Sequence, residues 1–412
     1  MELKPGYKQT EVGIIPKEWD VPHLRLHLLQ DATYGVVKAG TFQRIGILMI
    51  RGGDIKAGAI TGDQPLISVE KSREYSRTIL KERDVVIALV GYPGESAVVP
   101  TRLVGANISR AVGLLRPAET LLPEFLACYL NSPNGRKEFL RPSAGSAQIV
   151  VNLGALNQLR IPLPDDSEQR AIATALSDVD TLLGALDRLI AKKRDLRQAA
   201  MQQLLTGQTR LPGFHGEWEV KRLGNTGDIK SGGTPSTSQP QFWDGEVPWC
   251  TPTDITALGD HKYLTETSRS ISDAGVKASS AEVIPPRSLI ITSRATIGEC
   301  AINVMPMTTN QGFKNVVPFP EIDVEFLYYL MTMQKAGLIS LCAGSTFLEI
   351  SKKQLSAYEI TLPRDRSEQT AIATVLSDMD ADLAVLEARR DKTRALKQGM
   401  MQVLLTGVIR LV

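Results

Sequence analysis

The sequence has few cysteines, and none of them stands in a pattern that binds metal or builds a disulfide framework. They are isolated from one another along the chain: Cys128, Cys250, Cys300 and Cys342. Lone thiols of this kind are typical of buried side chains in a reducing compartment, so we expect a cytoplasmic protein. The histidines complete no zinc pattern, since the closest pair, His23 and His27, has no further ligand nearby in the sequence. We therefore expect no metal site.

Long hydrophobic runs and a large excess of charge are also absent. No stretch approaches the length of a membrane span, and the N-terminal residues lack the apolar centre of a signal peptide, so we expect no membrane partner. The formal net charge is only +2 over 412 residues. A protein that binds DNA on its own usually carries a strong basic excess. If this chain binds nucleic acid, we expect another subunit to neutralise many of the phosphates.

The common motifs of cofactor binding and catalysis are missing. The sequence contains no GxxxxGK[ST] phosphate loop, no GxGxxG after a strand, no GxSxG elbow and no HExxH. The Asn/Asp-Pro-Pro-aromatic tetrapeptide of amino-methyltransferases is absent too, because the one Pro-Pro pair, Pro285-Pro286, follows Ile284. Residues 91–94 and 232–235 are typical of turns, or of loops that approach a phosphate. We expect no catalytic residue and no cofactor.

What the sequence does contain is one stretch of 45 residues twice. Residues 167–211 and 367–411 align without a gap at an offset of 200, and 25 of the 45 positions are identical. Both copies begin with Ser-Glu-Gln, at Ser167 and Ser367, and both contain Leu-Leu-Thr-Gly near their ends. A repeat of this length and fidelity indicates a duplicated architecture.

Each copy predicts one long helix. In the first copy, apolar residues recur in steps of four and three, at Ile172, Leu176, Val179, Leu183, Leu186 and Ile190. The second copy keeps this series at Ile372, Leu376, Met379, Leu383 and Leu386. Such spacing forms a heptad seam along one face of a helix. At 1.5 Å per residue, each helix is roughly 60 Å long.

The ends of both helices carry their own signals. Asp165 and Asp365 each stand three residues before a Glu, which predicts a capping box, and the serine two residues further on is the alternative cap. Gly207 and Gly407 predict the C-terminal stops. No proline interrupts residues 167–207 or 367–407. The chain therefore has the signals for two uninterrupted helices.

A heptad seam requires a partner helix. A core helix of an ordinary domain is one interpretation, but the length and the duplication favour pairing of the two copies with each other. About 155 residues join the end of the first helix to the start of the second. In an antiparallel pair these two ends adjoin, so a single globular segment fits between them. We predict an antiparallel coiled coil with a globular segment at each end.

The segments outside the helices repeat more loosely. Residues 18–21, Glu-Trp-Asp-Val, recur as Glu-Trp-Glu-Val at 217–220, and Asp54-Ile55 recurs as Asp254-Ile255. Short β-branched stretches alternate with Gly, Pro and Asn turns, which predicts an α+β fold for each segment. The predicted organisation of the chain is a globular domain, a helix, a second globular domain and a second helix: residues 1–164, 165–207, 208–363 and 364–412.

Polar side chains beside glycine-rich turns are candidates for contacts with nucleic acid, because they and the backbone N–H groups can reach phosphates or base edges. In the first globular segment the candidates are Lys38, Arg44, Arg51, Tyr92, Arg110, Ser146 and Gln148. In the second they are Lys230, Thr234, Ser236, Trp249, Arg294, Gln311, Lys314, Ser345 and Thr346. Each of them, taken singly, is also compatible with an ordinary solvated residue.

This arrangement resembles the specificity subunit of type I restriction–modification systems. The resemblance is carried by the two Ser-Glu-Gln helices that end in Leu-Leu-Thr-Gly, by Glu-Trp-x-Val at the start of each globular segment, and by the turns at 52–55 and 232–236. It implies that the globular segments are target recognition domains, each reading one half of a split site in double-stranded DNA. It also implies that the helices form an antiparallel spacer that docks two methyltransferase (modification) subunits, and that restriction subunits complete the nuclease.

The residues alone are also compatible with two other functions. A coiled-coil scaffold would bind only protein and would give no sequence-selective protection of DNA. An enzyme with an unrecognised site would turn over its substrate as an isolated chain. The two globular segments share a frame but differ in most side chains, and a scaffold has little use for two versions of one frame. The specificity subunit, without catalytic activity of its own, is therefore the favoured function.

Overall fold

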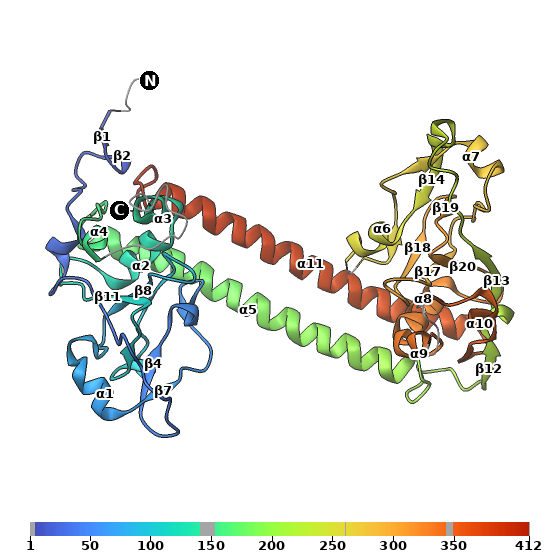
Figure 1. Ribbon diagram of the computed structural model, residues 1–412, viewed down its shortest axis with the longest axis horizontal. Helices are drawn as coiled ribbons and strands as arrows, with labels where there is room; N and C mark the ends of the chain where they lie inside the picture. Colours follow the sequence, from blue (N-terminus) through green and yellow to red (C-terminus); the bar gives the residue numbers. More distant parts are fainter. Residues whose placement is uncertain (1–4, 141–152, 260, 343–348, 412) are drawn as a thin grey trace. The chain divides into compact units, whose positions relative to one another are not determined.

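The computed structural model of this protein describes residues 5–140, 153–259, 261–342 and 349–411 (Figure 1). The chain folds into two compact units. Unit 1 comprises residues 1–188 together with 387–412, and unit 2 comprises residues 189–386. Each unit therefore contains one globular part and a stretch of each long helix.

The two predicted long helices are present and equal in length. Helix α5 spans Asp166–Leu204 and helix α11 spans Arg366–Leu404, with 39 residues each. The Glu168 backbone N–H donates to Asp165 Oδ1 at 2.8 Å, so the aspartate caps the first helix as its spacing predicted. Gly207 and Gly407 lie three residues beyond the helix ends with φ of +71° and +69°, the left-handed conformation that favours glycine.

In unit 1 the two helical stretches run in opposite directions. Ile172 and Leu176, near the start of α5, share a hydrophobic core with Met401 and Leu404, near the end of α11. One turn beyond Leu176, Asp180 Oδ1 lies 2.6 Å from the Nζ atom of Lys397, which precedes Met401. A residue later in α5 thus meets a residue earlier in α11, which is the geometry of an antiparallel pair.

The stretches in unit 2 show the same relation. Met201 and Leu204, near the end of α5, share a core with Ile372 and Leu376, near the start of α11. Lys193 of α5 lies earlier in that helix and pairs with Asp382, later in α11, at 2.9 Å between Nζ and Oδ2. The predicted seam residues are all buried or half-buried, from Ile172 to Ile190 in α5 and from Ile372 to Leu386 in α11.

The strands of unit 1 form two-, three- and four-stranded sheets with the orders β1-β2, β5-β6, β10-β4-β7 and β3-β11-β8-β9. Their bounds are β1 (Tyr7–Thr10), β2 (Gly13–Pro16), β3 (Thr33–Tyr34), β4 (Ile47–Ile50), β5 (Ile55–Lys56), β6 (Ala59–Ile60), β7 (Leu66–Ile67), β8 (Val85–Ala88), β9 (Ser96–Val98), β10 (Asn107–Ile108) and β11 (Val112–Leu115).

The strands of unit 2 form two-, three- and five-stranded sheets with the orders β12-β21, β16-β14-β19 and β13-β20-β17-β18-β15. Their bounds are β12 (Trp218–Arg222), β13 (Gly227–Ser231), β14 (Trp243–Cys250), β15 (Tyr263–Leu264), β16 (Ser270–Ile271), β17 (Leu289–Thr292), β18 (Cys300–Asn303), β19 (Thr308–Thr309), β20 (Phe313–Pro318) and β21 (Glu359–Pro363).

Short helices complete both units. The α-helices are α1 (Val69–Glu74), α2 (Pro123–Asn131), α3 (Pro133–Leu140), α4 (Leu153–Asn157), α6 (Pro252–Ala257), α7 (Asp273–Lys277), α8 (Val324–Met333), α9 (Lys335–Ser340) and α10 (Lys352–Ala357). The 3-10 helices are η1 (Leu24–His27), η2 (Gly52–Asp54), η3 (Ser76–Thr78), η4 (Thr101–Leu103), η6 (Leu223–Asn225) and η7 (Pro240–Phe242).

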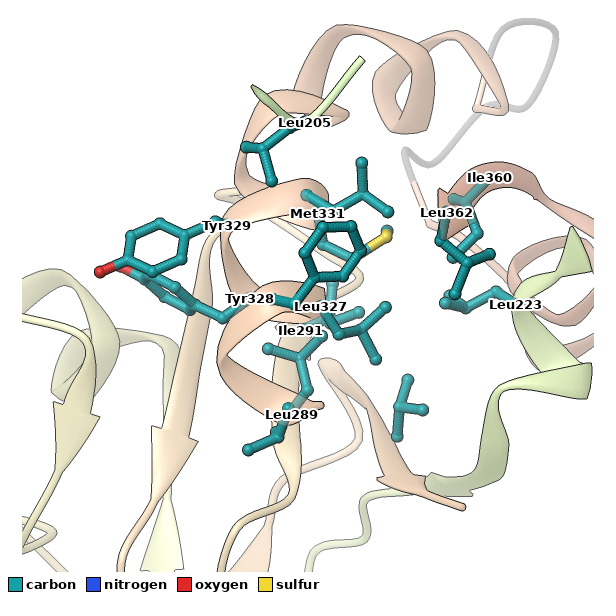
Figure 2. Packing of buried hydrophobic residues seen from close by; sticks show 14 of the residues in the cluster. Leu205, Leu223, Leu289, Ile291, Leu327, Tyr328, Tyr329, Met331, Ile360 and Leu362 are labelled. Atoms are coloured by element: carbon teal, nitrogen blue, oxygen red, sulfur yellow. The ribbon is translucent and has the colours of Figure 1, made fainter. Parts of the chain in front are cut away.

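The central strand of each unit is buried on both faces. In β17, Leu289 and Ile291 join the core that contains α8, whereas Ile290 joins a separate core on the other face. This division follows from the alternation of side chains along a strand. Figure 2 shows Leu289 and Ile291 beneath the helix that carries Leu327 and Met331. In unit 1, Val85 and Ile87 of β8 face the core that includes Phe125 of α2, and Val86 and Ala88 face the other core.

Strand register relates the two frames residue by residue. Ile87 of β8 is opposite Gly113 of β11, and Ile291 of β17 is opposite Lys314 of β20. Both pairings are antiparallel, and each unit also pairs a long strand in parallel with a short one, β4 with β10 and β14 with β19. The looser repeat that the sequence indicated is therefore a shared frame, on which different side chains are mounted.

Candidate nucleic-acid interface

The polar candidates of unit 1 gather where two parallel strands end. Strands β4 and β10 run side by side, with Ile50 opposite Ile108. Arg51 follows β4, and Arg110 lies two residues beyond β10. The Arg110 backbone N–H donates to the Val36 carbonyl at 2.9 Å, which brings the segment that carries Lys38 to the same place. We call residues 36–44, 51–54, 90–94 and 109–111 the loop edge of unit 1.

A close approach of backbones holds the loop edge of unit 1 together. A Cβ atom on Gly52 would lie 2.4 Å from the carbonyl oxygen of Val90 and 3.2 Å from that of Ala111, so only glycine fits there. This packing fixes the turn at 90–94, in which Tyr92 is 55% exposed. The Lys56 ammonium lies 5.2 Å from the centre of the Tyr92 ring. The turn thus presents an aromatic face beside a cation, an arrangement suited to nucleic acid.

The cations of this edge differ in their surroundings. Arg51 Nη2 lies 2.9 Å from Asp54 Oδ1, and this hydrogen bond raises the pKa of the guanidinium. Lys38, Arg44 and Arg110 are exposed. The charge of Arg51 is thus offset by a carboxylate, whereas the other three side chains face solvent. Two further candidates lie outside the described residues: Ser146 and Gln148.

Unit 2 builds an equivalent edge from the same strand pair. Strands β14 and β19 run in parallel, with Trp249 opposite Thr308. A Cβ atom on Gly232 would lie 1.8 Å from the Asn310 carbonyl oxygen, so the 231–236 turn packs directly on the loop after β19. Thr234 Oγ1 donates to the side-chain oxygen of Gln311, and both residues are exposed. We call residues 231–236, 251–254, 293–296 and 309–312 the loop edge of unit 2.

Trp249 lies beneath this edge and is only 5% exposed. Its Nε1–H donates to the Gly233 carbonyl at 2.9 Å, and its ring meets Trp243 edge to face at 5.0 Å between centroids. The indole therefore supports the glycine turn from inside. An exposed neighbour that the sequence did not single out is Arg269, whose guanidinium lies 3.9 Å from the centre of the Trp243 ring. Nothing local in the sequence links Arg269 with Trp243.

Two other candidates of unit 2 have polar partners within the chain. Lys230 Nζ lies 3.0 Å from Asp228 Oδ2 and 3.1 Å from Glu282 Oε2. The hydrogen bonds to Asp228 and Glu282 raise the pKa of this ammonium, and its charge is offset in the free protein. Ser236 Oγ lies 2.9 Å from Ser238 Oγ and is exposed. Ser345 and Thr346 lie outside the described residues.

Arg294 and Lys314 both lie against the carboxylate of Glu349. Arg294 follows β17 and is exposed, and its Nη2 lies 2.7 Å from Glu349 Oε2. Lys314, in β20, is 6% exposed. Burial lowers the pKa of Lys314, an effect that the charge of Glu349 opposes. Glu349 was not singled out from the sequence, because a lone glutamate carries no motif.

The two loop edges offer hydrogen-bond donors and cations. Arginine, lysine, glutamine, threonine and backbone N–H groups of the kind gathered there bind phosphates and base edges. Within the part of the chain that the structure describes, no three His, Cys, Asp or Glu side chains come together as a metal site. A separate search of the same residues finds no helix long and apolar enough to cross a membrane.

The long helices expose apolar side chains as well. In unit 1 these are Leu182, 40% exposed, and Leu396, 59% exposed. In unit 2, Leu189, Leu196 and Val385 are 41%, 49% and 68% exposed. Apolar residues that recur along a solvated helix indicate a surface for another protein.

Comparisons with known proteins match most of the chain. A family model described as the type I restriction modification DNA specificity domain matches residues 38–192 and again residues 215–393. The type I restriction enzyme MjaIX specificity subunit of Methanocaldococcus jannaschii is 39% identical over 166 residues, which cover 40% of this chain and 38% of that protein. The MjaX specificity subunit of the same organism is 25% identical over 429 aligned positions, 98% of this chain and 97% of the relative.

Two solved structures share the fold over nearly the whole chain. The HsdS subunit of Thermoanaerobacter tengcongensis aligns with a TM-score of 0.53 at 22% identity, covering 96% of this chain and 98% of the other. The type I restriction–modification S subunit from M. genitalium aligns with a TM-score of 0.58 at 16% identity, covering 98% of each chain. At these identities the likeness concerns the fold alone.

Proposed function

This chain belongs to the type I restriction–modification DNA specificity family, and we propose that each of its two recognition domains reads one half of a split site in double-stranded DNA. The proposed domains are residues 1–164 and 208–363, and the helical regions at 165–207 and 364–412 are the proposed spacers. The family match, which occurs twice, identifies the chain as a DNA specificity subunit. Its loop edges are the proposed sites of contact.

The proposal rests on one observation: the two units share a backbone frame but carry different side chains on it. By strand register, Val90 of unit 1 corresponds to Arg294 of unit 2, and Gly113 corresponds to Lys314. The positions that follow the paired strands β4 and β14 hold Arg51 and Thr251. Proteins that read different sequences need different donors and acceptors at equivalent places. Two edges with a common backbone and different side chains fit two different half-sites.

We propose that the long helices set the distance between the half-sites and bind two methyltransferase subunits, with restriction subunits completing the nuclease. The exposed apolar side chains of both helices, among them Leu196 and Val385, support such a docking surface. The small net charge of +2 also supports partners that supply phosphate contacts. The chain itself would then be non-catalytic, and purified protein should transfer no methyl group from S-adenosylmethionine to DNA.

An exchange of one recognition domain tests the proposal. Residues 20–160 are replaced by the equivalent segment of a relative, and the methylated motif is mapped across the genome of cells that carry the complete system. We expect one half of the motif to change while the other half stays the same. A change in both halves, or in neither, contradicts modular reading. A protein that acts only as a scaffold would give no sequence-selective methylation in any arrangement.

A further inference from the structure

Three charged side chains form a compact cluster at the loop edge of unit 2. Glu349 stands between two cations, with Oε2 at 2.7 Å from Arg294 Nη2 and Oε1 at 3.8 Å from Lys314 Nζ. The side chain of Arg294 is 44% exposed and that of Lys314 only 8%. One carboxylate thus offsets a surface cation on one side and a buried cation on the other.

The lysine is buried, whereas the side chains of Arg294 and Glu349 are 44% and 34% exposed. The backbone N–H of Ile350 donates to the Ser293 carbonyl at 3.0 Å, and Ile350 itself is 1% exposed, so the chain beside Glu349 is anchored in the core. Lys314 Nζ also lies 3.3 Å from the carbonyl oxygen of its neighbour Phe313. Because the side chain of Arg294 is 44% exposed, its guanidinium can leave Glu349 by rotating into solvent.

The side chains of this cluster are among those that differ between the two units, and they are not part of the backbone frame that the units share. The positions that register equates with Arg294 and Lys314 hold Val90 and Gly113 in unit 1. A buried ammonium is costly unless it has a charge partner. A requirement of the fold would appear in both units, so the buried lysine of unit 2 calls for an explanation specific to that unit.

We propose that Glu349 holds Arg294 in the free protein and releases it to a DNA phosphate, and that Lys314 keeps the carboxylate paired after the exchange. The proposal rests on the proposed function of the loop edges. Before binding, the carboxylate is shared by two cations. After binding, Arg294 pairs with phosphate and Glu349 pairs with Lys314, so the buried ammonium keeps its charge partner throughout. Glu349 is thereby a positioning residue that sets the affinity of unit 2 for DNA.

The exchange predicts opposite changes in affinity for two variants, and it predicts that the gain from Glu349→Gln depends on Arg294, which a change of charge alone does not. Without Glu349, Arg294 is free from the start, so Glu349→Gln should strengthen binding. Without Lys314, departure of Arg294 leaves Glu349 unpaired, so Lys314→Met should weaken it. Phosphate contacts carry no sequence information, so a duplex of mixed sequence is a sufficient probe. The expected change is about threefold to tenfold in each direction, the size of one phosphate contact.

The test measures the affinity of the full chain, in complex with its methyltransferase subunits, for a labelled mixed-sequence duplex of about 30 base pairs at several salt concentrations. Matched controls come from Glu219, which is likewise held by two cations, Lys221 at 2.9 Å and Arg364 at 3.4 Å, in the β12–β21 sheet. Glu219→Gln and Lys221→Met make the same changes of charge away from the loop edge, and neither should alter affinity by more than about twofold.

The outcomes separate the exchange from the broader proposal. Tighter binding by Glu349→Gln, weaker binding by Lys314→Met and unchanged controls support it, and Arg294→Gln should remove most of the gain from Glu349→Gln. If Glu349→Gln behaves like Glu219→Gln, the exchange is wrong while DNA binding stands. If thermal melting shows that the Lys314→Met variant does not fold, the affinities of the Glu349→Gln and Arg294→Gln variants still test the exchange. Failure of the wild-type complex to bind any duplex overturns the proposed function itself.

Discussion

Arg210 donates two hydrogen bonds to Glu368, from Nε to Oε1 at 2.5 Å and from Nη2 to Oε2 at 2.7 Å. Trp218 Nε1–H lies against the same carboxylate at 3.4 Å. Because Arg210 follows α5 and Glu368 lies in the first turn of α11, the pair ties the end of one long helix to the start of the other within unit 2. Unit 1 repeats the arrangement, with Arg410 and Trp19 both donating to Glu168.

The Arg210–Glu368 pair should be among the strongest polar contacts of unit 2. Glu368 is only 2% exposed, so Arg210→Met leaves a buried carboxylate without its cation, at a cost of about 3–5 kcal/mol. The matched control is Arg364→Met, since Arg364 is 63% exposed and its pairing with Glu219 should contribute at most about 1 kcal/mol. Urea unfolding followed by tryptophan fluorescence measures both variants. Equal losses of stability would count against a special role for Arg210.

Two positions of α11, two residues apart, test which face of that helix is buried and which faces solvent. Leu383 is 8% exposed and Val385 is 68% exposed, and both lie in unit 2. Leu383→Asp places a charge in an apolar contact and should cost several kcal/mol, about 3 or more. Val385→Asp adds the same charge on the solvated side and should change stability by about 0.5 kcal/mol or less. Thermal and urea unfolding compare them, and a reversed order of the two losses would mean that the heptad seam is misassigned.

The long helices could be predicted because their signals are local, whereas the partners of their charged residues are not. Asp165 caps α5 at the spacing that the sequence indicated. The capping box was expected to use the carboxylate of Glu168 as well, but that carboxylate accepts from Trp19 Nε1 at 2.9 Å and from Arg410. Those two partners lie 149 and 242 residues away along the chain. No pattern within a few residues of Glu168 could have identified them.

The candidate site shows the same division between local and distant information. Glycine turns such as Gly232–Gly233 marked where the loops are, and the structure brings those loops to one edge of each unit. The sequence did not indicate which candidates are buried, because Trp249 and Lys314 are covered by residues from other strands. Glu349 was overlooked because its importance depends on two cations that precede it by 35 and 55 positions. Which side chains touch DNA remains a prediction.

The four cysteines should react slowly in the folded protein. Burial raises the pKa of Cys128 to about 11, and it raises the pKa of Cys250 further. Only the thiolate reacts with alkylating agents, and a free thiol has a pKa of about 8.5. At pH 8 native Cys128 should therefore be alkylated roughly a hundredfold more slowly than the same residue in denaturant. Peptide mass spectrometry after timed iodoacetamide treatment gives both rates, and similar rates would contradict the burial.

Lengthening the helices tests whether they set the gap between the half-sites. Four residues inserted after Leu186 and four after Leu386 extend α5 and α11 by about one turn each, or roughly 6 Å. An insertion of four residues is a coiled-coil stutter, which disturbs a heptad seam less than an arbitrary length does. Insertion into both helices keeps their lengths matched, so the helix-end pairs Arg210–Glu368 and Arg410–Glu168 are untouched.

DNA rises about 3.4 Å per base pair, so the gap in the methylated motif should grow by one or two base pairs while both half-site sequences stay the same. Genome-wide mapping of methylation in cells that carry the altered chain reads the gap directly. As a control, four residues are inserted into the 212–216 linker, where they should leave the gap unchanged, because that segment lies outside both helices. A fully active double-insertion variant with the original gap would mean that the distance is set elsewhere, in the recognition domains or in the partner subunits.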